Sequence, residues 1–205
     1  MLEVYRRPYD AQRPLVCMDE TSKQLLEDTR PPLPVKPGQK HRVDSEYRRH
    51  GVNNLFLFFA PLEGWRDVQV TDHRTKGDWA YAMKTLSDVQ FPEAERIIVV
   101  LDNLNIHRPS SFYEVFEPNE ARRLVERFEF HYTPKHGSWL NMAEIEFSIL
   151  SRQCLNRRIP EADTLRQETA AWVQQRNAQQ AKVTWRFTTA DARIKLIKLY
   201  PSISM

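Results

Sequence analysis

The hydrophobic pattern of the chain is clearest at residues 97–101, Ile-Ile-Val-Val-Leu, where no polar position interrupts the run. Five consecutive β-favouring apolar residues indicate a strand buried on both faces, as in the middle of a parallel or mixed sheet. The run stops at Asp102, whose carboxylate is costly to bury without a partner. Because open α/β sheets bind ligands at the carboxyl ends of their strands, Asp102 marks a candidate site.

Five other stretches have the pattern of strands. Residues 15–19, Leu-Val-Cys-Met-Asp, form a second apolar run that closes on an aspartate. Residues 40–50 alternate as in an exposed strand and residues 55–60 are apolar, so with a turn at residues 51–54 they predict a hairpin. The remaining strand patterns lie at residues 65–70, as a short edge strand, and at residues 128–132.

Amphipathic periodicity predicts the helices. Residues 77–89 place Trp79, Ala82, Met83 and Leu86 on one stripe, which indicates a helix with one buried face. Further helical patterns occupy residues 110–127 with a break at Pro118, residues 142–155, residues 161–180, and a last basic stretch that Thr188 or Thr189 caps and that runs through Lys198.

This order of strands and helices predicts an α/β fold, a ribonuclease H-like mixed sheet flanked by helices with a C-terminal helical extension. We expect a lead-in arm at residues 1–13 and the ribonuclease H-like domain at residues 14–156. Residues 157–205 are expected to form the helical extension, packed on the same domain. In this arrangement two central strands end in Asp19 and Asp102.

Composition narrows the class of protein. A chain of 205 residues with 41% hydrophobic positions supports one domain with an ordinary core. Its apolar runs are too short to span a bilayer, and its N-terminus has no signal-peptide core. The two cysteines, Cys17 and Cys154, make neither a disulfide framework nor a zinc set. We therefore expect a cytoplasmic protein without a membrane partner.

The charge is compatible with nucleic acid as a partner without requiring it. The formal net charge is +3, and basic residues gather between positions 30 and 50. Lys36, Lys40 and Arg42 are candidates for contacts with a DNA backbone. The alternative is a solvated loop with charges that bind nothing.

Acidic residues supply the candidate chemistry. Strand-end aspartates are also common as turn formers and helix caps, so Asp19 and Asp102 alone are weak signals. Phosphoryl transfer, however, uses carboxylates to hold Mg²⁺, and a third carboxylate on a neighbouring helix completes such a cluster. Glu144 and Glu146 both qualify. Glu144 shares a polar helix face with two serines but also resembles half of a capping box, whereas Glu146 lies among apolar positions that tolerate a charge only when it is paired or coordinated.

Three motifs resemble those of the DDE transposases, closest to the bacterial insertion-sequence "six-thirty" group that is related to mariner-like elements. They are Asp19-Glu20-Thr21, Asp102-Asn103 with His107 four residues on, and Ser138-Trp139-Leu140-Asn141-Met142-Ala143-Glu144. The third motif of the family typically reads Ser-Pro-x-Leu-Asn-Pro-x-Glu. Matching Leu140-Asn141 to it places the catalytic acid on Glu144.

The resemblance implies a catalytic core in which Asp19, Asp102 and Glu144 hold two Mg²⁺ ions, with Mn²⁺ as a substitute. Cleavage of double-stranded DNA at element ends, strand transfer into target DNA and a homodimer on DNA follow from it, in a bacterial protein that joins the nucleoid when active. The spacing between Asp102 and Glu144 is longer than usual in mariner relatives. Only eighteen residues precede Asp19, so we expect a helix-turn-helix module on a partner chain or in a missing N-terminal domain.

Further residues receive supporting roles. Asn103, His107 and Asn141 would orient groups near the acids, and Lys135 with His136 would contact DNA phosphates. A helix-capping asparagine, a buried histidine and a solvated loop are the alternatives.

Glu20 is excluded from the metal set, because alternation turns it away from Asp19. Two other functions stay open: a catalytically inactive transposase-derived DNA-binding or assembly protein, and another ribonuclease H-like nuclease.

Overall fold

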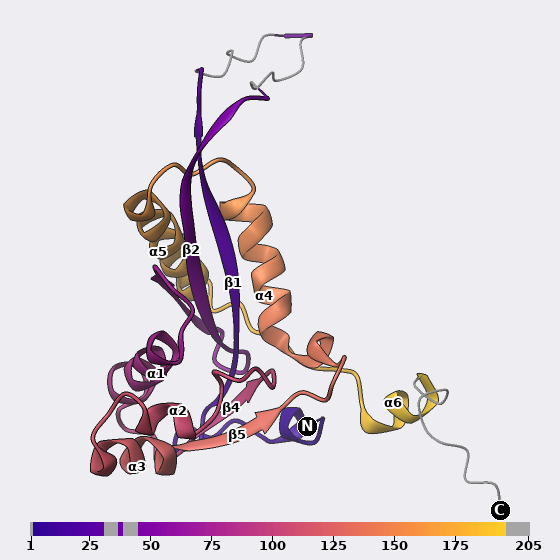
Figure 1. Ribbon diagram of the computed structural model, residues 1–205. Coiled ribbons are helices and arrows are strands. Elements are labelled where there is room, and N and C mark those ends of the chain that lie inside the picture. Colours follow the sequence, from indigo (N-terminus) through magenta and orange to yellow (C-terminus); the bar gives the residue numbers. More distant parts are fainter. Residues whose placement is uncertain (1, 31–36, 39–44, 196–205) are drawn as a thin grey trace, which may run out of the picture.

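The computed structural model describes residues 2–30, 37–38 and 45–195, and it contains a five-stranded mixed sheet in the order β3-β2-β1-β4-β5 (Figure 1). β1 pairs with β2 and β2 with β3 antiparallel, whereas β1 with β4 and β4 with β5 are parallel. This sheet with helices around it confirms the predicted ribonuclease H-like fold class. The strands are β1 Leu15–Asp28, β2 Tyr47–Ala60, β3 Trp65–Thr71, β4 Ile97–Leu101 and β5 Phe128–Tyr132.

Two expectations about the first strands are wrong. β1 does not end at Asp19 but continues to Asp28, because β2 pairs with it far beyond the point where β4 stops, at Cys17. Residues 51–54 form no turn but lie inside β2, so the expected hairpin of residues 40–60 does not exist. Residues 39–44 lie outside the described part of the chain. The two strands instead make a long ribbon that extends past the helices (Figure 1).

Turn-forming residues are accommodated inside β2 by partners from neighbouring elements. The Asn53 amide donates to Asp72 Oδ1 (2.9 Å), and Asn54 Oδ1 accepts from the Ser22 hydroxyl (2.7 Å). Gly51 has φ +96°, which glycine adopts without the steric cost of a side chain. Long-range pairing with β1 therefore overrides the local turn preference of this stretch.

The helices agree with the sequence pattern as far as the structure describes them; residues 196–198 of the expected last helix lie outside the described residues. The break before Pro118 is present, and a hydrogen-bonded pair of Thr188 and Asp191 caps the last helix. The helices are α1 Lys76–Thr85, α2 Ser110–Tyr113, α3 Pro118–Arg127, α4 Met142–Leu150, α5 Ala162–Ala178 and α6 Thr189–Lys195, with single π-helical turns after α1 (Leu86–Gln90) and α4 (Ser151–Leu155) and 3-10 turns at Val4–Arg6 and Ser138–Leu140.

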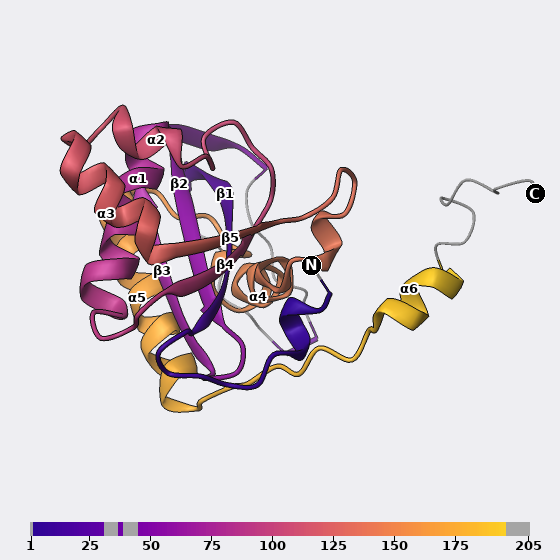
Figure 2. The ribbon, with the colours of Figure 1, turned by 90° about the horizontal axis from the view of Figure 1, so that it is seen from below.

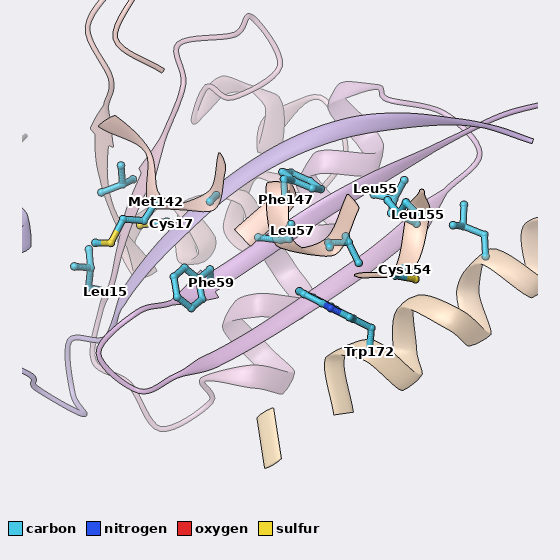
Figure 3. Close-up of a cluster of buried hydrophobic side chains, with 14 of the residues drawn as sticks. Leu15, Cys17, Leu55, Leu57, Phe59, Met142, Phe147, Cys154, Leu155 and Trp172 are labelled. Atoms are coloured by element: carbon cyan, nitrogen blue, oxygen red, sulfur yellow. The ribbon is translucent and has the colours of Figure 1, made fainter. Parts of the chain in front are cut away.

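The sheet has a hydrophobic core on each face because its side chains alternate. On one face Leu55, Leu57 and Phe59 of β2 pack with residues of α4 and α5, including Phe147 and Trp172 (Figure 3). On the other face Phe56, Phe58 and Ala60 of β2 pack against α1, α2 and α3. Figure 2 shows these three helices grouped on one side of the strands and α4 on the other. The result is a three-layer arrangement with β1 and β4 in its middle.

The N-terminal segment is more than a polar lead-in. Val4 and Tyr5 are buried in the α4 face of the core, although the sequence there has no periodic pattern. The Tyr5 hydroxyl donates to the Leu140 carbonyl (2.8 Å), just before α4. None of the helices in the described part of the chain has the length and hydropathy that crossing a bilayer requires.

Candidate active site

The sheet brings Asp19 and Asp102 side by side. In the parallel pair of β1 and β4, Cys17 lies opposite Val100. The same register continued by two residues sets Asp19 beside Asp102, which directly follows β4. β1 does not turn after Asp19. Beyond Cys17, however, β4 no longer pairs with β1, and the carboxylates lie at the edge of the sheet that this leaves open.

The ionisation of Asp19 reflects this crowding. The pKa of Asp19 is raised to about 7, chiefly by burial; the hydrogen bond from the Glu20 backbone N–H opposes the increase, and the charges of Glu20, Asp102 and Glu144 add to it. Glu144 thus lies close enough to Asp19 to affect its charge, although 125 positions separate them along the chain. Asp102, after β4, and Glu144, on α4, thus lie within electrostatic range of Asp19 on β1.

Asn141 fixes the start of α4 against β1. This fully buried residue is the N-cap of the helix, and its Oδ1 accepts from the Ala143 N–H (3.1 Å). Its Nδ2 donates to the carbonyl of Met18 (2.8 Å), the residue before Asp19. Asn141 therefore ties the helix turn that carries Glu144 to the strand that carries Asp19, a positioning role rather than contact with a substrate.

The two glutamates of α4 have different surroundings. Glu146 is completely buried, and its Oε1 lies 2.9 Å from Arg66 Nε and 3.0 Å from Arg176 Nη2. The expectation that a charge at this position requires a partner is met by these two guanidinium groups, from β3 and α5. Among the described residues, no hydrogen bond or ion pair holds the Glu144 carboxylate. Glu144 is thus the glutamate available to a ligand.

His107 connects Asp102 to Glu20. Its fully buried ring has Nδ1 2.6 Å from Asp102 Oδ1 and Nε2 3.1 Å from Glu20 Oε2. Burial alone would lower the pKa of His107, but hydrogen bonds to Asp102 and Glu20 and the charges of both carboxylates raise it to about 9. The ring is therefore an imidazolium that lies between the two carboxylates. Arg74, 3.5 Å from Glu20 Oε1, extends the chain of charges.

The same three residues, Glu20, Asp102 and His107, lie close enough to form a possible ligand group for a metal ion. His107 Nδ1 makes an ion-pair contact of 2.6 Å with Asp102 Oδ1 and a hydrogen bond of 3.3 Å with the Asp102 backbone carbonyl. We therefore interpret the group as linked by protons. Burial tends to raise the pKa of Asp102, but the hydrogen bond from His107 lowers it overall. The bonds from His107 and the Leu104 amide are both to Oδ1, which leaves Oδ2 for another ligand.

A pocket of about 420 Å³ opens beside Asp102. Lys135 and His136, both exposed, lie on its wall. Their loop is tight: His136 has φ +62°, and a Cβ at Gly137 would lie 2.6 Å from Pro134 Cγ. The lining residues are Asp102, Asn103, Leu104, Thr133, Pro134, Lys135, His136 and Ser138.

The predicted site residues are therefore distributed unevenly. Asp102 and Glu144 lie within electrostatic range of Asp19, whereas the group whose ligand atoms lie within 4.8 Å of one another is Glu20, Asp102 and His107. Asn103, Lys135 and His136 lie at the adjoining pocket. Lys36, Lys40 and Arg42 lie outside the described residues.

Sequence reasoning missed the part of Glu20, as the second carboxylate on His107, and of Tyr5. Alternation along the strand indicated that Glu20 turns away from Asp19, toward the other face of the sheet. A carboxylate buried on that face needs a partner, and this need was the signal that could have indicated His107. Tyr5 donates to the segment before α4, and no signal in the N-terminal sequence indicates this.

The donor set fits a divalent cation. Three carboxylates that share one site oppose each other's ionisation, as the raised pKa of Asp19 records, and a hard cation relieves this. Glu144 is partly exposed and Asp102 retains an oxygen, so both accept a ligand from the solvent side.

Comparisons with known proteins identify the family and the fold. Residues 14–166 match the family model described as DDE superfamily endonuclease. No curated protein matches the chain. Among solved structures, a Mos1 transposase paired-end complex with the left transposon end is similar with a TM-score of 0.58 and 15% identity, over 88% of this chain and 54% of that one.

Two further structures show the same fold. The Mos1 strand transfer complex has a TM-score of 0.57 at 12% identity, over 88% of this chain and 57% of that one. A Mos1 mariner paired-end complex with Mn has a TM-score of 0.55 at 15% identity, over 88% and 54%. The chain thus spans a little over half the length of these structures. The family match covers most of the chain, and the chain belongs to the DDE superfamily of endonucleases.

Proposed function

We propose that this chain is the catalytic core of a transposase, which cuts DNA at the ends of an element and joins them to target DNA. The observation that carries the proposal is the strand register that sets Asp19 beside Asp102 at one edge of the sheet, with Asp102 and Glu144 within electrostatic range of Asp19. The similar Mos1 structures are transposase complexes, including a strand transfer complex, which supports DNA as the substrate class.

The three acids would be the metal ligands. When bound, two Mg²⁺ ions would activate the attacking oxygen and stabilise charge on the leaving 3′-oxygen. The chain's own residues hold the ligands in place: His107 fixes Oδ1 of Asp102, and Asn141 fixes the start of α4 against the strand of Asp19. Lys135 and His136 would contact phosphates from the pocket beside Asp102.

Within the superfamily we assign the chain to the insertion-sequence "six-thirty" group, on the Leu140-Asn141-Met142-Ala143-Glu144 sequence of the third motif. We further propose that the active form is a homodimer on DNA. Recognition of the element ends would come from a helix-turn-helix module on a partner chain or an N-terminal domain.

The test is metal-dependent nicking of supercoiled DNA by purified protein. D102N should abolish nicking with Mg²⁺ and with Mn²⁺ while DNA affinity is kept. Glu126, exposed on α3 and far from these acids in the fold, offers E126Q as the matched control, which should nick at the wild-type rate. Retained nicking in D102N would refute the assignment.

The alternative functions predict other results. An inactive DNA-binding protein would bind duplex DNA but show no cleavage with either metal. Preference for an RNA–DNA hybrid or a junction over duplex ends would indicate another ribonuclease H-like nuclease.

A further inference from the structure

A second groove lies between β1 and the end of α4. It has a volume of about 420 Å³. Its walls come from the part of β1 beyond Asp19 and from the π-helical turn that follows α4. The lining residues are Thr21, Ser22, Lys23, Ser151, Arg152, Leu155 and Asn156.

The groove continues from the carboxylates. Thr21 lies two residues after Asp19 on β1, so both side chains point to the same face of the sheet. On α4, Ser148 and Ser151 follow Glu144 by four and seven residues, on the same helix face. Strand and helix lie side by side in Figures 1 and 2. Asp19 and Glu144 thus stand at one end of the groove, and Arg152 stands at the other.

The lining suits a phosphate backbone. It contains hydroxyl groups, an amide and two cationic side chains, and neither aspartate nor glutamate is among its residues. The Lys23 ammonium is already engaged, because it donates to the carbonyls of Leu155 (2.6 Å) and Arg157 (2.9 Å) and closes the π-helical turn. Arg152 is exposed and makes no hydrogen bond or ion pair with the described residues. Its guanidinium is therefore available to an anion from outside.

We propose that this groove holds the sugar-phosphate backbone of the DNA strand that is cut, with Arg152 on one of its phosphates. The inference rests on the proposed function. Eight residues separate Glu144 from Arg152, which is roughly 12 Å along a helix axis. Phosphates of one strand advance about 3.4 Å per nucleotide along a duplex. A strand that follows α4 from the acids therefore places Arg152 near the third or fourth phosphate from the cut.

The first measurement is binding of a fluorescent 30-base-pair DNA duplex in Ca²⁺, at several salt concentrations, together with nicking in Mg²⁺. Losing one phosphate contact should lower the affinity of R152A about tenfold at low salt and reduce the salt slope by about one. The control is R122A, which removes an exposed arginine of α3 whose partner is Glu126. It should bind within twofold of wild type.

The second measurement locates the contact. Single methylphosphonates, which remove one phosphate charge, are placed at successive positions on each side of the mapped cut. At the third or fourth position the substitution should weaken wild-type binding and leave R152A unchanged, because that variant has already lost the contact.

Several results would overturn the inference. They are equal binding by R152A and R122A, the same methylphosphonate profile in R152A and wild type, or a wild-type chain that binds no duplex. A wild-type chain that binds DNA through Arg152 yet never nicks it would refute the proposed nuclease activity but would still support the proposed phosphate contact in the groove.

Discussion

At the scale of single residues, the site is organised by buried polar groups that do not touch the substrate. His107, Asn141 and Glu146 are fully buried, and each fixes an element that carries or supports a catalytic candidate. A buried polar group is tolerated only when its hydrogen bonds are satisfied, so these residues are costly to lose and hold one geometry. Substitutions at these residues therefore distinguish a role in positioning the site from a role in stabilising the fold.

His107 is expected to control the geometry of Asp102. H107A removes the bond to Oδ1 and frees the carboxylate to rotate. Loss of such outer partners typically costs about 10- to 100-fold in metal affinity or activity. We expect nicking by H107A to need more Mg²⁺ and to fall in rate by that range. H50A is the control, since His50 is exposed and contacts Glu27 on the ribbon. Wild-type metal dependence in H107A would show that the bond does not position Asp102.

The two glutamates of α4 should respond in opposite ways to the same substitution. E146Q leaves Arg66 and Arg176 without their shared carboxylate in a dry environment. Breaking a buried pair costs about 3–5 kcal/mol, so its urea midpoint should fall strongly. E144Q removes a carboxylate that is held by no such partner, and should abolish nicking with its urea midpoint unchanged or raised. Equal stability of the two variants would contradict the assigned roles.

At the scale of elements, the sequence pattern predicts most helices and the central strands. The uninterrupted run 97–101 and the apolar residues 55–60 are buried as expected, because local hydrophobicity reports burial. The predictions fail where a residue or strand that is distant in sequence determines the local structure. β1 and β2 are long because they pair with each other, which neither pattern reveals. Glu20 with His107, and Glu146 with Arg66 and Arg176, join positions far apart in sequence. Such contacts carry no local signal.

The turn between β2 and β3 is set by its contact with the end of α5. Gly64 has φ +72°, and a Cβ there would lie 2.6 Å from the Gln180 carbonyl carbon and oxygen. Gly51 also has a positive φ, but a Cβ there meets nothing within 4 Å. G51A should cost about 1–2 kcal/mol for its backbone alone. G64A should cost more and loosen α5. Equal losses in urea unfolding would show that Gly64 is needed only for its φ.

At the scale of the whole molecule, the fold is built around a destabilising centre. In the proposed site three carboxylates face one another where burial already disfavours charge, and their ionisation would lower the free energy of unfolding until a cation binds. Stability and function are therefore opposed at this edge of the sheet. A substitution that removes one charge should strengthen the fold and weaken the site.

D19N tests this opposition through pH. The folded pKa of Asp19 is raised to about 7, above the 3.8 that is ordinary for an aspartate, so the ionised carboxylate reduces stability at high pH, and protonation restores it as the pH falls. D19N should exceed wild type in thermal stability at pH 8, and the gain should shrink as the pH falls through 7 and vanish near 4.

Mg²⁺ should raise the melting temperature of wild type at pH 8 and leave D19N nearly unchanged, because ligand binding stabilises only a fold that retains the site. D10N, in an aspartate of the N-terminal segment that lines a different pocket, is the control. A D19N protein less stable than wild type at pH 8, or one that Mg²⁺ stabilises equally, would mean that the acids do not share a cation.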